Sequence, residues 1–141
     1  MTGPHLARLC GALLLLALPG AARAAAIQVE VDGAEPGGGP ILVTICQGGL
    51  SGAACSLGDK SGDGRFLFRD VPPGTYAVAA FQDTNGNGQL DRTGLGLPLE
   101  PYGLSNDAGR RGRPDFRDAA FSLREPGALI RVRLVRALPR R

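Results

Sequence analysis

The chain has 141 residues, with 16 Lys and Arg against 13 Asp and Glu, 22 Gly, 11 Pro, three Cys, one His and no Trp. This length fits one small domain. The high Gly and Pro content favours short elements joined by tight turns, which excludes a helical bundle, a coiled coil and a collagen. The chemistry available is also narrow, because His5 is the only His and Lys60 the only Lys.

Residues 1–24 have the pattern of a secretory signal peptide. A weakly basic start is followed by an apolar run from Leu9 to Leu18 and by Ala22-Arg23-Ala24, a small-residue cleavage site. The apolar run has only about half the length that a membrane-crossing helix needs, so we expect cleavage rather than a retained anchor. We therefore expect a periplasmic or secreted domain over residues 25–141 without a membrane span.

Cleavage would remove Arg8 and Arg23 and leave a domain close to neutral. Binding to nucleic acid needs a dense positive face, and stacking on bases needs exposed aromatic rings. Because the domain offers little of either, we expect no nucleic-acid partner.

Two cysteines, Cys46 and Cys55, remain after cleavage. In an oxidising compartment a disulfide between them is the default expectation. Their spacing is not that of a redox motif, and no His remains to activate a nucleophile. The disulfide is therefore expected to be structural, and the protein is expected not to be an enzyme.

Short runs of apolar residues, alternating or β-branched and separated by Gly and Pro turns, predict a series of strands. The strands are expected, in chain order, at residues 27–31, 41–46, 64–69, 75–81, 119–123 and 129–135. The run 75–81 is apolar on both faces, which is typical of a central strand packed on both sides. Six to eight such strands predict an all-β fold, a single antiparallel, immunoglobulin-like β-sandwich with one long loop at 83–118.

The long loop begins with residues 83–91, here called the Asn-Gly loop, which match the first nine positions of a calcium-binding loop. Gly88 stands where such loops turn sharply. The expected ligands are Asp83, Asn85, Asn87, the carbonyl of Gln89, and Asp91.

The twelfth position is Gly94, where an EF-hand has a bidentate Glu, so further oxygens must come from elsewhere. The nearest candidates in the sequence are Glu100, Asn106 and Asp107. We expect weak calcium binding, with a Kd of about 10⁻⁴ to 10⁻³ M. Because two Asn-Gly steps also form good turns without any metal, a metal-free turn remains the alternative.

Four motifs, one of which contains the Asn-Gly loop, are spread over the whole domain and follow one another in a characteristic order and spacing. They are VPPGTYAV at 71–78, FQDTNGNGQLD at 81–91, GLPLEPYGLSN at 96–106 and PDFRDAAF at 114–121. Together they resemble an uncharacterised family of secreted bacterial proteins, domain of unknown function 2141. The resemblance implies an exported, prealbumin-like β-sandwich and no established activity. The chain departs from the family pattern at Gln82, where His is expected, and at Pro101, where Gly is usual.

These observations favour a recognition or structural module at the cell envelope, in which calcium orders the segment after the Asn-Gly loop. Its partner is unidentified, and a glycan is one candidate. A metal-free sandwich that binds sugar is an alternative. Its aromatic platform would consist of Tyr102 and Phe116, the only aromatic residues in the long loop. A small hydrolase that uses two carboxylates is a weaker alternative, because glycoside hydrolysis needs only such a pair.

Overall fold

The computed structural model describes residues 23–110 and 112–139. The predicted signal peptide therefore lies outside the described residues, except for Arg23 and Ala24. No helix in the described part of the chain has the length and apolar character needed to cross a membrane.

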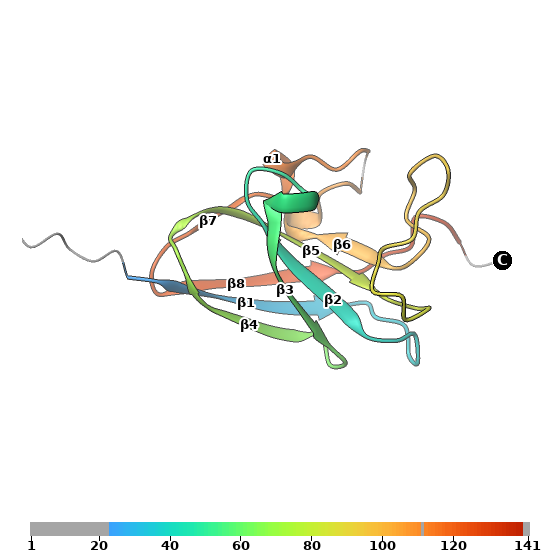
Figure 1. Ribbon diagram of the computed structural model, residues 1–141, viewed down its shortest axis with the longest axis horizontal. Helices are drawn as coiled ribbons and strands as arrows, with labels where there is room; N and C mark the ends of the chain where they lie inside the picture. The colour runs from blue at the N-terminus through green and yellow to red at the C-terminus, as the bar shows by residue number, and fades with distance from the viewer. Residues whose placement is uncertain (1–22, 111, 140–141) are drawn as a thin grey trace, which may run out of the picture.

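The chain folds into two β-sheets that pack face to face (Figure 1). One sheet has the strand order β4-β1-β8, and the other has the order β3-β2-β5-β6, with the short β7 paired to the start of β5. The strands are β1 (Ala25–Asp32), β2 (Ile41–Cys46), β3 (Cys55–Ser61), β4 (Arg65–Val71), β5 (Gly74–Gln82), β6 (Tyr102–Leu104), β7 (Phe121–Leu123) and β8 (Gly127–Arg133). The predicted all-β sandwich is confirmed.

The pairing differs from the purely antiparallel prediction in one place. β1 and β8 run parallel, in register from Ala26 opposite Gly127 to Asp32 opposite Arg133. Parallel and antiparallel partners give a half-buried strand the same period-two alternation, so the sequence pattern could not distinguish them.

Three elements differ from the predicted strand series. β6 lies inside the predicted long loop 83–118 and divides it. β3 was not predicted, and it is a largely exposed edge strand that pairs only with β2. Residues 116–119 form a short helix, α1 (Phe116–Ala119), where a strand was expected to begin. Asp115 caps this helix by accepting a hydrogen bond from the backbone N–H of Arg117 at 3.2 Å, so β7 begins only at Phe121.

The core lies between the sheets and is built from the inward-facing residues of both. In β1 the alternation predicted from the sequence holds, since Ile27 and Val29 are fully buried. They pack with the inward residues of the other strands, among them Val43, Val78, Leu123 and Val132. The structure contains the predicted Cys46–Cys55 disulfide. A smaller cluster beside it packs Cys46 with Ala77, Leu104 and Ala119.

The two sheets are joined along one side. Tyr102 of β6 exchanges backbone hydrogen bonds with Val135, just beyond β8, at 3.0 and 2.9 Å. Gly103 permits this approach, because a Cβ there would lie 2.3 Å from the carbonyl oxygen of Arg133. The long loop between β5 and β6 therefore leaves and re-enters the sandwich at this joined side.

Candidate functional site

The Asn-Gly loop leaves the sandwich directly from the end of β5, and its first residue fixes its shape. Asp83 is 3% exposed. Its Oδ1 accepts a hydrogen bond from the backbone N–H of Asn87 at 3.2 Å, and its Oδ2 accepts one from that of Gly88 at 2.8 Å. Gly86 and Gly88 have φ values of 73° and 75°, which side-chain-bearing residues rarely adopt, so the loop folds back over the Asp83 carboxylate.

The other predicted ligands meet at Asp91. The Nδ2 of Asn85 donates to Oδ2 of Asp91 at 2.5 Å, and the Nδ2 of Asn87 lies 3.0 Å from both Asp91 oxygens. An amide presents oxygen instead of nitrogen after a 180° flip with little change of shape. The Oδ1 of Asn85 accepts the backbone N–H of Asn87 at 3.2 Å, and the Oδ1 of Asn87 accepts that of Gln89 at 3.0 Å. A flip that turned these oxygens to a cation beside Asp91 would give up both hydrogen bonds.

Glu100 joins the two ends of the Asn-Gly loop. It is 2% exposed, and its Oε1 accepts hydrogen bonds from the backbone N–H and the hydroxyl of Thr84 at 2.9 and 3.2 Å. Its Oε2 accepts one from the backbone N–H of Asp91 at 3.1 Å. The sequence predicted Glu100 as a further ligand. In the structure its buried carboxylate connects the two ends of the Asn-Gly loop, and it is the third carboxylate of this region beside Asp83 and Asp91.

The remaining candidates have other contacts. Gln89 donates its backbone N–H to Oδ1 of Asn87 at 3.0 Å, so it lies within the Asn-Gly loop. Asp107 pairs with Arg110 at 3.0 Å, and the Nδ2 of Asn106 donates to the carbonyls of Asp118 and Ala120, so neither is joined to the loop by these bonds. Across residues 23–110 and 112–139, no three His, Cys, Asp or Glu side chains are grouped closely enough to hold a metal. A cation at this loop would need the Asn oxygens.

Gln82 holds the β1–β2 connection, residues 33–40, against the start of the Asn-Gly loop, a role that the sequence analysis missed. Its Oε1 accepts from the backbone N–H of Glu35 at 2.8 Å. Its Nε2 donates to the carbonyls of Glu35 at 2.9 Å and Gly39 at 3.2 Å. Gln82 is 2% exposed and follows Val78 and Ala80 on the inward face of β5, so a polar side chain at an inward position was the available signal.

Arg136 connects the β1–β2 connection to the segment that precedes β6. Its Nη2 donates to Oε2 of Glu35 at 2.8 Å, and its Nη1 donates to the carbonyl of Leu99 at 3.0 Å. The hydrogen bond to Glu35 raises the pKa of the Arg136 guanidinium, a group that is charged at neutral pH in any case. The segment between the Asn-Gly loop and β6 is thus held by Glu100 from within and by Arg136 from outside.

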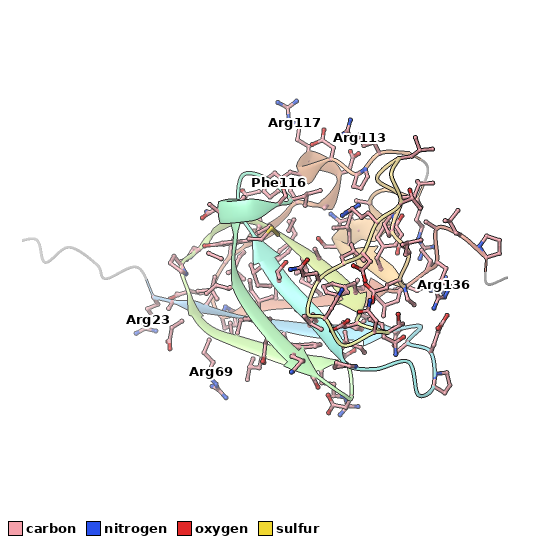
Figure 2. The ribbon with its side chains drawn as sticks, turned by 45° about the vertical axis from the view of Figure 1, so that its right-hand side comes forward. Arg23, Arg69, Arg113, Phe116, Arg117 and Arg136 are labelled. Carbon is pink, nitrogen blue, oxygen red and sulfur yellow. A yellow bond between two sulfur atoms is a disulfide. The ribbon has the colours of Figure 1, made fainter. Side chains whose placement is uncertain are left out.

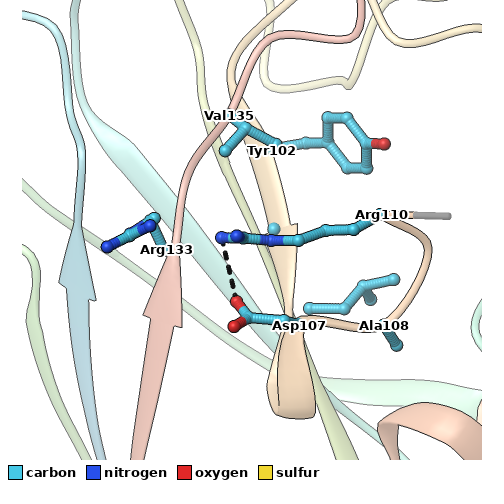
Figure 3. A pocket seen from close by; sticks show the side chains of 8 residues that line it. Tyr102, Asp107, Ala108, Arg110, Arg133 and Val135 are labelled. Carbon is cyan, nitrogen blue, oxygen red and sulfur yellow. Dashed lines mark ion pairs between the residues drawn. The ribbon is translucent and has the colours of Figure 1, made fainter.

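The two aromatic rings of the predicted loop 83–118, Tyr102 in β6 and Phe116 in α1, do not form an exposed platform. Tyr102 is half-buried and lines a shallow pocket with the Asp107–Arg110 pair and Arg133 (Figure 3). Phe116 is half-buried and packs on the small cluster beside the disulfide. Glu100 is not among the residues that line the pocket. The two rings therefore do not provide the exposed platform on which the sugar-binding alternative depends.

Comparison with known proteins gives a single result. No curated protein and no solved structure shows significant similarity to the chain. The model of one family, described as an uncharacterised protein conserved in bacteria (DUF2141), matches residues 29–130, which include the strands β2 to β7 and the whole long loop. The chain belongs to this family of uncharacterised bacterial proteins.

Proposed function

We propose that the Asn-Gly loop binds one calcium ion and that the protein is an exported recognition or structural module at the cell envelope. The observation that carries the proposal is an excess of negative charge. No Lys or Arg of the described residues lies within ion-pair distance of Asp83, Asp91 or Glu100. Arg136 interacts with the charge of Glu100 at longer range, but it forms its ion pair with Glu35. Asp83 and Glu100 are buried and Asp91 is partly exposed, and carboxylates that lack a basic partner are stabilised by a bound cation.

The ligand set is one that calcium accepts. Asp83 and Asp91 supply carboxylate oxygens, the flipped amides of Asn85 and Asn87 supply two more oxygens, and the carbonyl of Gln89 supplies a fifth, with water completing the shell. Magnesium needs stricter octahedral geometry, and zinc prefers nitrogen and sulfur ligands that this loop does not have. The expected affinity is weak, with a Kd of about 1 mM, which suits a compartment rich in calcium.

Calcium at this loop would act on the segment that follows it. Glu100 binds the backbone at Thr84 and at Asp91, so fixing the loop also fixes Glu100 and the chain that leads into β6. We infer that the role of the cation is to order a surface for a partner and that the protein performs no catalysis. Export is supported by the signal-like pattern of residues 1–24 and by the disulfide.

Thermal unfolding of the purified protein in EDTA, calcium or magnesium tests the proposal. At a calcium concentration about ten times the Kd, binding to the folded state alone adds about 1.4 kcal/mol, or about 5 °C in Tm. Asp91→Asn should abolish this shift, because it removes a ligand charge at a partly exposed position. Asp118→Asn, an exposed acid on α1, is the matched control and should keep the shift.

Equal melting temperatures in EDTA and calcium would refute the calcium site and leave the Asn-Gly loop as a metal-free turn. An equal shift in Asp91→Asn would place the calcium elsewhere.

A further inference from the structure

The Asn-Gly loop contains two Asn-Gly steps in succession, Asn85-Gly86 and Asn87-Gly88. All four residues are exposed, and the loop lies at the end of the sandwich that carries Arg136 (Figure 2). A Cβ built on either glycine would meet no other atom within 4 Å. Solvent therefore reaches both steps, and access to solvent does not distinguish them.

An Asn-Gly step is the sequence most open to spontaneous deamidation, because glycine has no side chain to hinder the approach of its backbone nitrogen. That nitrogen gives its proton to a base in the solvent and attacks Cγ of the preceding Asn. A bond forms between the nitrogen and Cγ, the bond from Cγ to Nδ2 breaks, and Nδ2 takes up a proton and leaves as ammonia. Water then opens the succinimide ring, and the Asn has become an Asp or an isoaspartate.

The two side-chain amides under attack are held in the same way. Oδ1 of Asn85 accepts the backbone N–H of Asn87 at 3.2 Å, and Oδ1 of Asn87 accepts that of Gln89 at 3.0 Å. A donor at this oxygen stabilises the negative charge that develops there during the attack. Both amides also donate Nδ2 to Asp91. The Asn side chains therefore do not distinguish the two steps either.

The two attacking nitrogens differ. The backbone N–H of Gly88 donates to Oδ2 of the buried Asp83 carboxylate at 2.8 Å. That carboxylate holds the proton that must leave, and its charge disfavours a second negative charge on the Gly88 nitrogen. The backbone N–H of Gly86 makes no hydrogen bond within the described part of the chain. We propose that Asn85 is a site of spontaneous deamidation and that Asp83 protects Asn87 from the same reaction.

The reaction changes the charge of the loop. It replaces an amide that donates to Oδ2 of Asp91 at 2.5 Å by a carboxylate that repels this oxygen. The Asn-Gly loop thus gains negative charge as the protein ages. The proposal concerns the covalent chemistry of the chain itself and does not rest on the proposed calcium ion.

Mass spectrometry of peptides tests this proposal. The protein, purified from cells that express the full chain, is incubated in EDTA at mildly alkaline pH, with and without denaturing guanidinium chloride. Samples are digested over time, and fragmentation between residues 85 and 87 assigns each conversion of an amide to an acid. In guanidinium chloride, where the fold is lost, Asn85 and Asn87 should react at similar rates. In the folded protein, Asn87 should react at least about tenfold more slowly than Asn85, as the cost of breaking a hydrogen bond to a carboxylate requires.

Asp83→Ala tests the protecting role of the carboxylate. It removes the acceptor of the Gly88 N–H, so Asn87 should then react about as fast as Asn85 in the folded variant. Asp118→Ala, at an exposed acid of α1, is the matched control and should leave the ratio of the two rates unchanged. Thermal melts show whether each variant is folded, and the ratio in the unchanged protein decides the proposal without either of them.

The proposal is overturned if Asn85 stays intact in the folded protein while it reacts in guanidinium chloride. It is equally overturned if Asn87 reacts as fast as Asn85 in the folded protein. An unchanged ratio in folded Asp83→Ala would overturn the protecting role of Asp83.

Discussion

Replacement of Gln82 by Ala should destabilise the protein strongly, although the residue is polar and at the end of a strand. The side chain makes three hydrogen bonds to the backbone of the β1–β2 connection, two at Glu35 and one at Gly39. A net value of about 1 kcal/mol for each bond gives about 3 kcal/mol in the free energy of unfolding. For a domain of this size that corresponds to a fall in Tm of about 12 °C.

Circular dichroism melts measure this effect directly. Gln47→Ala is the matched control, since Gln47 is exposed, and it should change Tm by no more than about 2 °C. Gln82→Glu sharpens the test, because it keeps one acceptor but places a carboxylate oxygen against two carbonyl oxygens. It should be at least as unstable as Gln82→Ala at neutral pH and regain stability as the pH falls and the carboxyl is protonated. The reasoning is refuted if Gln82→Ala melts within about 2 °C of the unchanged protein.

Three further outcomes are expected. Glu100→Gln should lower the stability by about 1.5–3 kcal/mol, because an amide N–H then faces a backbone N–H at one end of the Asn-Gly loop, and its Tm reports the loss. Replacing Cys46 and Cys55 together by Ala should cost about 2.5–3 kcal/mol by the chain-entropy argument, and denaturant melts of the two forms measure it. The Ser61 hydroxyl, followed by backbone N–H groups, lowers the pKa of Asp63 below its ordinary 3.8. The unchanged protein should therefore be more stable than Asp63→Asn above about pH 4, and this difference should vanish as the pH falls below the lowered pKa. Paired thermal melts of the two proteins across that pH range measure the difference.

The sequence predicted most of the strands that bury one face or both, but not β6, a three-residue strand inside the predicted long loop. Residues 27–31 and 75–81 alternate or are apolar throughout, and β1 and β5 contain them. β3 escaped prediction because an exposed edge strand with Gly58, Asp59 and Lys60 has no apolar period, and its structure comes from its pairing with β2. The short helix α1 was missed because a single turn with one buried residue, Ala119, leaves no helical period to detect.

The candidate site was predictable where its residues are adjacent in the sequence. Spacing alone grouped Asp83 with the rest of the Asn-Gly loop, and the structure brings Asn85 and Asn87 to Asp91. The contacts of Gln82 with the β1–β2 connection span more than 40 residues, so no local pattern encodes them. The brace formed by Glu100 depends in the same way on where the chain returns to the sandwich.

The parallel pairing of β1 with β8 has a kinetic consequence. β1 is the central strand of its sheet, and its pairing with Gly127–Arg133 must close a loop of about 100 residues before it contributes stability. Such high contact order slows folding, and a ribosome-bound chain that has not yet released β8 lacks one whole edge of that sheet. The topology therefore delays completion of the sandwich until β8 has left the ribosome, so the chain stays incompletely folded for longer than a sheet built from neighbouring strands would.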